Sequence, residues 1–183
     1  MKVVLLGSLP KGDQVREDWV DWKTTYIGTL TQAVPGIMIL HGDMISDNVG
    51  PEIVVGHDLW LIKHSDICVV DASQKLGAGT AQEMVLAKLY KKPVVTVLPK
   101  DTYHRRSNIT FDGIEMNEWI HPFIVVASDY IANNIDEAAA WLNTYASNPK
   151  KLNIKDINVF EAAISRFENK FPDIVSDYTS RLG

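Results

Sequence analysis

The segment spanning residues 66–99 constrains the fold more than any other part of the chain. Residues 67–70 form a short apolar run of the kind found in strands that are buried on both faces, and residues 93–98 form a second. Between them, the Gly-Ala-Gly-Thr stretch at 77–80 predicts a turn and the start of a helix. A strand, a helix and a strand in this order predict a parallel βαβ unit with a right-handed crossover.

The rest of the chain continues this alternation, which predicts an α/β fold: a parallel five-stranded sheet with helices on both faces and an appended C-terminal helix. Strands are expected at 2–6, 37–40, 67–70, 93–98 and 123–127, and helices at 13–34, 52–65, from 79 onward, at 135–145 and at 154–171. Residues 99–117 are expected to be irregular and to cover the site as a lid. We expect one domain over 1–147, with a helical extension over 148–183 packed on it.

Composition excludes several classes of protein. The chain has 183 residues, of which 46% are hydrophobic and 22% charged, as in ordinary soluble domains. Its net charge of -5 argues against a nucleic-acid partner, because a phosphate backbone requires a basic surface. There is no leader segment and no apolar run near 18 residues, so we expect no membrane partner and a cytoplasmic location. The single cysteine, Cys68, is expected in the core.

No metal or cofactor is expected. The chain has no H-x-x-x-H or C-x-x-C spacing and no clustered acidic pattern. The Gly-rich stretch at 77–80 lacks the third glycine of a dinucleotide fingerprint and the Lys-Ser/Thr of a phosphate loop.

The carboxyl ends of the parallel strands are the expected ligand site. Backbone N–H groups at the helix start near Gly79 attract an anion or a sugar hydroxyl, and Glu83 follows one turn later. Asp58, in the helix that enters the third strand, can reach the same edge. The alternative is that both acids are surface charges favoured by the helix dipole, and that Asp71 is a strand-end cap. His41 and Asp43 can face a ligand but do not by themselves make a metal site.

Two stretches, DLWLIKHSDICVVDAS and GAGTAQEMVLAKLYKKPVVTVLP, occur here in an order that resembles the nucleoside 2-deoxyribosyltransferase family. The loop GSLPKGD after the first strand is similar to that of the related 2′-deoxynucleoside 5′-phosphate N-hydrolases. The resemblance implies a flavodoxin-like homo-oligomer that cleaves the N-glycosidic bond of a nucleoside or nucleotide. It implies that Glu83 is the nucleophile and that Asp58 assists the departing base. Val4 stands where family members often carry a tyrosine.

This chemistry suits two carboxylates, because positive charge develops on the anomeric carbon while the base leaves as a poor anion. The residues expected to bind substrate are Gly7, Ser8, Leu9, Pro10, His41, Asp71, Gly77, Gly79 and Thr80. The cations expected to meet a 5′-phosphate are Lys11, Lys75, Arg105 and Arg106, although a solvated loop is an alternative for the two arginines.

Three questions stay open at this point. The sugar acceptor is either a second base or water, and the substrate is either a nucleoside or its 5′-monophosphate, with a slight preference for the monophosphate. The chain is alternatively a nucleotide-binding module without turnover, which Val4 and the C-terminal extension favour. A third possibility is a phosphoribohydrolase of the cytokinin-activating type, whose motif also ends in G-T-x-x-E.

Overall fold

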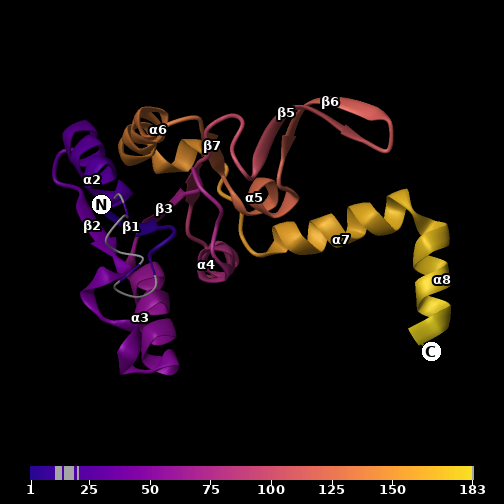
Figure 1. Ribbon diagram of the computed structural model, residues 1–183, viewed down its shortest axis with the longest axis horizontal. Helices are drawn as coiled ribbons and strands as arrows, with labels where there is room; N and C mark the ends of the chain where they lie inside the picture. The colour runs from indigo at the N-terminus through magenta and orange to yellow at the C-terminus, as the bar shows by residue number, and fades with distance from the viewer. Residues whose placement is uncertain (11–13, 15–18, 20, 183) are drawn as a thin grey trace.

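The computed structural model describes residues 1–10, 14, 19 and 21–182, and within them it confirms the predicted α/β fold. Five parallel strands form one sheet in the order β2-β1-β3-β4-β7, which is the flavodoxin-like arrangement (Figure 1). The strands are β1 (Lys2–Leu6), β2 (Met38–His41), β3 (Ile67–Asp71), β4 (Val94–Val97) and β7 (Tyr130–Ala132). The order reverses beside β1, so the carboxyl ends of β1 and β3 border the crevice where such sheets bind ligands.

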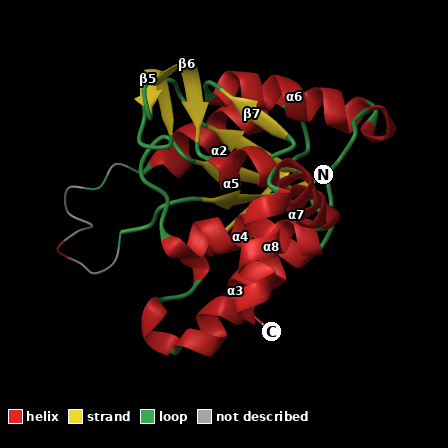
Figure 2. Cartoon of the chain, turned by 90° about the vertical axis from the view of Figure 1, so that its right-hand side faces the viewer, coloured by secondary structure: helices red, strands yellow, loops and turns green. Residues whose placement is uncertain are grey.

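Two hydrophobic cores lie on the two faces of this sheet, and helices cover both (Figure 2). Alternate residues of β1 divide between them, with Val3 in one core and Val4 in the other. Helices α2 (Trp22–Ala33) and α6 (Ile135–Ser147) cover the first face. The second face is covered by α3 (Pro51–His64), α4 (Ala78–Leu89) and α5 (Pro122–Ala127). Cys68 is fully buried in the second core, as predicted, and its burial raises the pKa of the thiol to about 12.

The helix predicted over 13–34 is confirmed over Trp22–Ala33 as α2, and Gln14 is also helical. Asp21 is the N-cap of α2, and its carboxylate accepts a hydrogen bond of 3.0 Å from the Lys23 N–H. Trp19 and Asp21 are not helical, and most of the earlier part of the predicted helix lies outside the described residues. The loop after β2 contains two short 3₁₀ turns, Gly42–Met44 and Asp47–Val49.

The fifth strand was predicted in the wrong place. Residues 123–127 are helical, as part of α5, and the strand is β7. A short apolar run does not by itself distinguish a buried strand from a buried helix, and Pro122 at the first helical position favours the helix here.

The irregular lid predicted over 99–117 is also wrong, because this segment forms most of a β-hairpin. Strands β5 (Arg105–Phe111) and β6 (Ile114–Ile120) pair antiparallel and project from the domain (Figure 1). Asp112 and Gly113 connect them with φ angles of 49° and 80°, which is the backbone sign that two-residue hairpin turns require. The hairpin is anchored by Arg105, which donates to the Leu98 carbonyl at 2.9 Å and to Glu118 at 2.8 Å.

The C-terminal segment contains two helices rather than the single one predicted over 154–171. They are α7 (Asn158–Lys170) and α8 (Pro172–Leu182), and they extend away from the sheet (Figure 1). Phe171 ends α7 because the following proline disfavours helical geometry in the residue before it. The segment before α7 is tied to the domain by Lys155, whose N–H donates to Asp129 at 2.7 Å. No helix within the described residues is long and apolar enough to cross a membrane.

Candidate functional site

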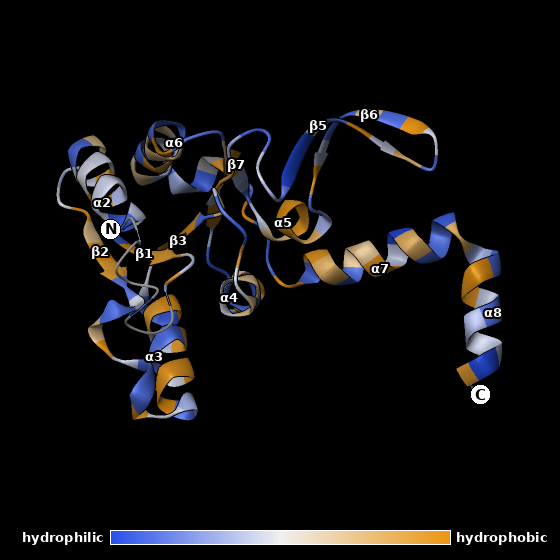
Figure 3. Cartoon of the chain, viewed as in Figure 1, coloured by the Kyte–Doolittle hydropathy of each residue, from blue (hydrophilic) through white to orange (hydrophobic). Residues whose placement is uncertain are grey.

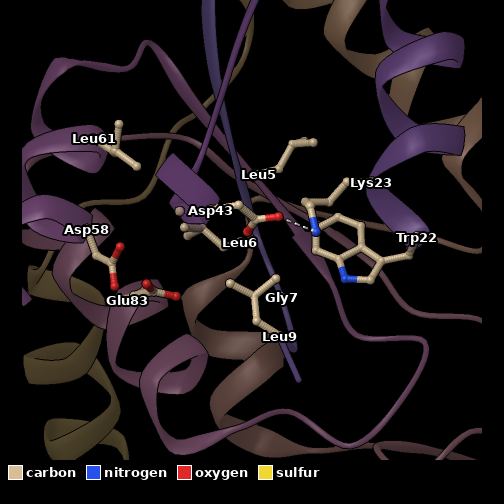
Figure 4. A pocket seen from close by; sticks show the side chains of 11 residues that line it. Leu5, Leu6, Gly7, Leu9, Trp22, Lys23, Asp43, Asp58, Leu61 and Glu83 are labelled. Carbon is tan, nitrogen blue, oxygen red and sulfur yellow. Dashed lines mark ion pairs between the residues drawn. The ribbon is translucent and has the colours of Figure 1, made fainter. Parts of the chain in front are cut away.

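A small pocket lies at the carboxyl end of β1, at the sheet edge where a ligand was expected (Figure 4). It has a volume of about 40 Å³. The described residues that line it are Leu5, Leu6, Gly7, Leu9, Trp22, Lys23, Gly42, Asp43, Asp58, Leu61 and Glu83. They come from β1 and the loop after it, from the first turn of α2, from the loop after β2, and from α3 and α4. The pocket therefore joins segments that lie far apart in the sequence.

Asp58 and Glu83 lie in this pocket together. Asp58 belongs to α3 and Glu83 to α4, and the two carboxylates point toward one another in Figure 4. The two helices pack against each other on the same face of the sheet, where Leu61 and Met84 enter the core. The imidazole Nδ1 of His57 lies 3.3 Å from Asp58 Oδ1, so a charged or hydrogen-bonding partner stands beside this carboxylate.

Two glycines allow the pocket walls to approach closely. A Cβ at Gly7 would lie 2.5 Å from Cζ2 of Trp22, too close for any side chain, and the indole Nε1 of Trp22 donates to the Ser8 carbonyl at 3.1 Å. A Cβ at Gly42 would lie 3.3 Å from Asp58 Oδ1. The chain thus holds an indole ring against the first loop and a carboxylate against the second.

Lys23 is the one cation among the described lining residues, and its side chain is almost completely buried. Its Nζ lies 2.9 Å from Asp21 and 2.8 Å from Asp43, and 4.2 Å from the centre of the Trp19 ring. Figure 4 shows the pair with Asp43 at the wall opposite Asp58 and Glu83. Neither Trp22 nor Lys23 was predicted as a site residue. The capping Asp21 was the sequence feature that could have indicated them, because it starts α2 beside the end of β1.

The other residues predicted from the first two loops fall at different distances from the pocket. Gly7 and Leu9 line it, while Ser8 and Pro10 do not. The Ser8 hydroxyl donates to the Lys75 carbonyl at 3.0 Å, which joins the loop after β1 to the loop after β3. His41 is partly buried just before Gly42 and is not itself a lining residue.

Asp71 is placed in the core rather than in the pocket. It is 5% exposed, and its Oδ1 accepts a hydrogen bond of 2.7 Å from the Tyr26 hydroxyl. The Ser73 N–H donates to the same oxygen at 3.3 Å. Burial and the adjacent Asp71 raise the pKa of Tyr26 far above its usual value.

The glycine turn expected to hold the sugar is not brought to this pocket. Gly77 instead lines a second cavity of about 200 Å³, together with Ala81 and Val85 of α4 and with His104, which precedes β5. Positions 81 and 85 project from the face of α4 opposite to position 83, so the helix separates the two cavities. Thr80 is buried, and Gly79 is exposed.

Of the four predicted phosphate cations, none lines the pocket within the described part of the chain. Lys11 lies outside the described residues. Lys75 is exposed, with its Nζ 5.1 Å from the centre of the Tyr103 ring. Arg105 is engaged in the hairpin anchor, including a 2.8 Å hydrogen bond to the Asn133 side chain, and Arg106 is exposed on β5.

No metal centre is apparent in the described ranges, where no three His, Cys, Asp or Glu side chains come together to hold an ion. Neither a family model nor a curated protein matches the chain. Among solved structures, the chain is similar to the Clostridium botulinum CMP N-glycosidase BcmB. The two share 15% sequence identity with a TM-score of 0.44, over 79% of this chain and 99% of that chain. A likeness at this level does not assign a function.

Proposed function

We propose that the chain cleaves the N-glycosidic bond of a nucleoside or deoxynucleoside, or of the corresponding 5′-monophosphate, with Glu83 as the nucleophile and a second base or water as the sugar acceptor. The observation that carries the proposal is the pair of carboxylates, Asp58 and Glu83, which reach one pocket from two different helices. Enzymes that break a glycosidic bond usually carry two carboxyl groups in one pocket, beside the anomeric carbon. The family resemblance of the sequence around Glu83 gives the same assignment.

In the proposed reaction the Glu83 carboxylate attacks the anomeric carbon from the face opposite the base. A carbon–oxygen bond to Glu83 forms while the carbon–nitrogen bond to the base breaks, and the base takes up the electron pair. Asp58 delivers a proton to the base as it leaves. A water molecule or a second base then displaces the sugar from Glu83, and Asp58 takes up the proton that this acceptor loses, so that both carboxyl groups return to their starting state.

The pocket walls suit this chemistry. Leu5, Leu6 and Leu61 give the pocket apolar walls, and excluding water strengthens the attraction between a carboxylate and the charge that develops on the sugar. A volume of about 40 Å³ encloses only the reacting end of a nucleoside. The base and the 5′ end would extend outside the enclosed part, across the loops after β1 and β2.

We infer a 5′-monophosphate as the better substrate. The buried Lys23 is paired with Asp21 and Asp43, so its charge is already balanced within the protein. Lys75 is exposed, and its backbone is bonded to Ser8 of the pocket loop. Lys75 thus belongs to a loop that is bonded to the pocket loop, and we propose that its ammonium group binds a phosphate on the 5′ end.

The proposal is tested by incubating the protein with deoxynucleosides and their 5′-monophosphates, with and without a second base, and measuring free base by chromatography. Glu83→Gln is expected to abolish base release while ligand affinity stays within a few fold. Asp58→Asn is expected to slow substrates with poor leaving bases most, since an activated base needs little proton assistance. Glu52→Gln is the matched control, because Glu52 is an exposed acid in the first turn of α3.

Free base with and without an acceptor identifies hydrolysis, and a new nucleoside identifies transfer. Activity of Glu83→Gln within tenfold of the wild type would remove the nucleophile assignment. Binding of the ligand without any turnover by the wild type would establish the alternative, a nucleotide-binding module of this fold.

A further inference from the structure

The two C-terminal helices carry an apolar stripe that nothing in the chain covers among the described residues. In this C-terminal arm (α7 and α8), the stripe consists of Ile164, Phe167, Phe171, Ile174 and Tyr178. Within each helix the members are three or four residues apart, which places them on one face of that helix, and Phe171 lies between the two helices where α8 changes direction. Each is 42% to 55% exposed, and neither helix contains a buried residue. Figure 3 shows apolar segments alternating with polar ones along the arm.

The same chain carries an apolar groove of matching character between α4 and α5. This α4–α5 groove is lined by Ala81, Gln82, Val85, Leu86 and Phe123, and has a volume of about 400 Å³. It continues into the second cavity, which shares three of these residues. Phe123 and the neighbouring Leu89 are 67% and 53% exposed. Amphipathic helices bind in grooves of this kind through side chains spaced three and four residues apart.

We propose that the C-terminal arm of one copy of this chain binds in the α4–α5 groove of a second copy, and reciprocally, to form a two-fold dimer. The arm begins beside α5 and runs away from α4, and α8 then turns off after Pro172 (Figure 1). Most of the stripe therefore lies away from the groove of its own chain. When two copies exchange arms reciprocally, both the arm and the groove of each copy are covered. The two-fold assembly is then closed, with no arm or groove left to bind a third copy.

The area of the two surfaces is sufficient for a stable dimer. Five large apolar side chains of roughly 200 Å² each, about half exposed, leave on the order of 500 Å² of apolar surface on each arm. This approaches the upper end of what a typical monomer exposes, which is roughly 300–600 Å². Phe123 and the neighbouring Leu89 at the groove add roughly 200 Å² more, which brings each copy close to the roughly 800 Å² per partner of a standard interface.

The charges on the arm favour a protein partner over a lipid surface. Its acids are Glu161, Glu168, Asp173 and Asp177, and its bases are Arg166, Lys170 and Arg181. Helices that lie on anionic membranes are rich in Lys and Arg on the polar face, whereas this mixture has no excess of positive charge.

Sedimentation velocity of the full chain at micromolar concentrations tests the proposal. The wild type is expected to be a dimer, and Phe167→Glu is expected to weaken the dimer by about 100-fold or more, as removal of a central apolar anchor does. Leu89→Glu, on the groove side, is expected to have the same effect. Asn169→Glu is the matched control, because it adds the same charge to the exposed opposite side of α7 and should leave the dimer intact.

Crosslinking distinguishes exchange between copies from contact within one copy. Phe171→Cys and Leu89→Cys chains of different mass are mixed and treated with a short bifunctional maleimide. Cys68 is fully buried and does not compete. A heterodimer in excess over both homodimers is expected.

A wild type that stays monomeric would overturn the proposal, as would a dimer that survives both glutamate substitutions. A Leu89→Cys/Phe171→Cys chain that crosslinks only within itself would also overturn it. Co-sedimentation of a monomeric wild type with vesicles of phosphatidylcholine and phosphatidylserine would show that a lipid surface is the partner instead. None of these measurements uses a substrate, so their outcome is independent of the proposed N-glycosidic reaction.

Discussion

The Tyr26 hydroxyl donates a 2.7 Å hydrogen bond to the buried Asp71 carboxylate, which joins α2 to the carboxyl end of β3. The tyrosine comes from α2 and the aspartate from the end of β3, and they are 7% and 5% exposed. The bond therefore fixes α2, and with it Trp22 and Lys23, against the carboxyl end of the sheet. Asp71, which was predicted from the sequence to bind substrate, therefore joins two elements of the fold instead.

Tyr26→Phe is expected to lower the free energy of unfolding by about 1–3 kcal/mol, because a buried carboxylate loses its hydroxyl donor. The pKa of Tyr26 is raised above its ordinary value of 10.0, so this contribution is complete below pH 10 and is lost as the pH rises further. Urea unfolding at neutral pH and above pH 10 measures both effects. Tyr103→Phe, at an exposed tyrosine, controls for loss of a hydroxyl. Equal stability of Tyr26→Phe and the wild type at neutral pH would contradict the prediction.

A second buried pair fixes the other half of the sheet. Lys88 of α4 is paired with Asp129, and both side chains are essentially inaccessible, at 0% and 1% exposure. Burial lowers the pKa of Lys88. The Asp129 carboxylate also accepts N–H groups from Val94 and Lys155, each at 2.7 Å. One aspartate thus connects α4, β4 and the segment that leads to the C-terminal arm.

Lys88→Met is expected to cost about 3–5 kcal/mol of stability, because it leaves a carboxylate buried without its counter-charge. Lys63→Met, at an exposed lysine of α3, is expected to change stability by less than about 0.5 kcal/mol. Chemical denaturation of both variants measures the difference. A loss below about 1 kcal/mol for Lys88→Met would mean that Asp129 is adequately satisfied by its backbone donors.

Gly7→Ala is expected to displace the Trp22 indole, since the new Cβ would lie 2.5 Å from the ring. Because Trp22 lines the pocket, base release is expected to fall at least about tenfold, as misplacement of a pocket wall commonly does. Tryptophan fluorescence reports the displacement independently of activity. Gly28→Ala is the matched control, because no atom lies within 4 Å of its Cβ position on α2. It is expected to stabilise the protein by about 0.5–1 kcal/mol. Unchanged fluorescence and activity in Gly7→Ala would contradict the prediction.

The sequence predicts the parts of this fold that depend on buried periodic patterns. The apolar runs at β1, β3 and β4 are unambiguous because both faces of these strands are covered. The rule that parallel strands present their carboxyl ends to one edge allowed Asp58 and Glu83 to reach the same edge, and both line one pocket there. The sequence does not indicate which side of α4 the glycine turn faces, because that depends on how the helix packs. In the structure, Gly77 and Glu83 line different cavities.

The sequence was least informative where exposed segments are ordered by distant partners. The β5–β6 hairpin is mostly exposed and is anchored by Arg105. In the sequence, two adjacent arginines in a loop are equally consistent with such an anchor and with a phosphate-binding residue. The Asp112-Gly113 pair is a hairpin sequence, and greater weight on it would have predicted the turn. Lys23 was missed because a lysine in a helix is ordinarily exposed, whereas two aspartates and a tryptophan bury this one.

Lys75 is expected to decide the preference for a 5′-phosphate. Its loop is joined to the pocket loop by the Ser8 hydroxyl, and its ammonium group is exposed beside Tyr103. Lys75→Ala is expected to lower kcat/KM for the deoxynucleoside 5′-monophosphate about tenfold and to leave the unphosphorylated deoxynucleoside unaffected, because a single charge-assisted contact contributes about 1.5–3 kcal/mol. Arg106→Ala is the control, since this arginine is exposed on the hairpin and does not line the pocket. Steady-state kinetics on both substrates measures the ratio.

Equal loss on both substrates would indicate that Lys75 orders the loops rather than binding phosphate. A wild type with no preference for the phosphate would make the plain deoxynucleoside the substrate.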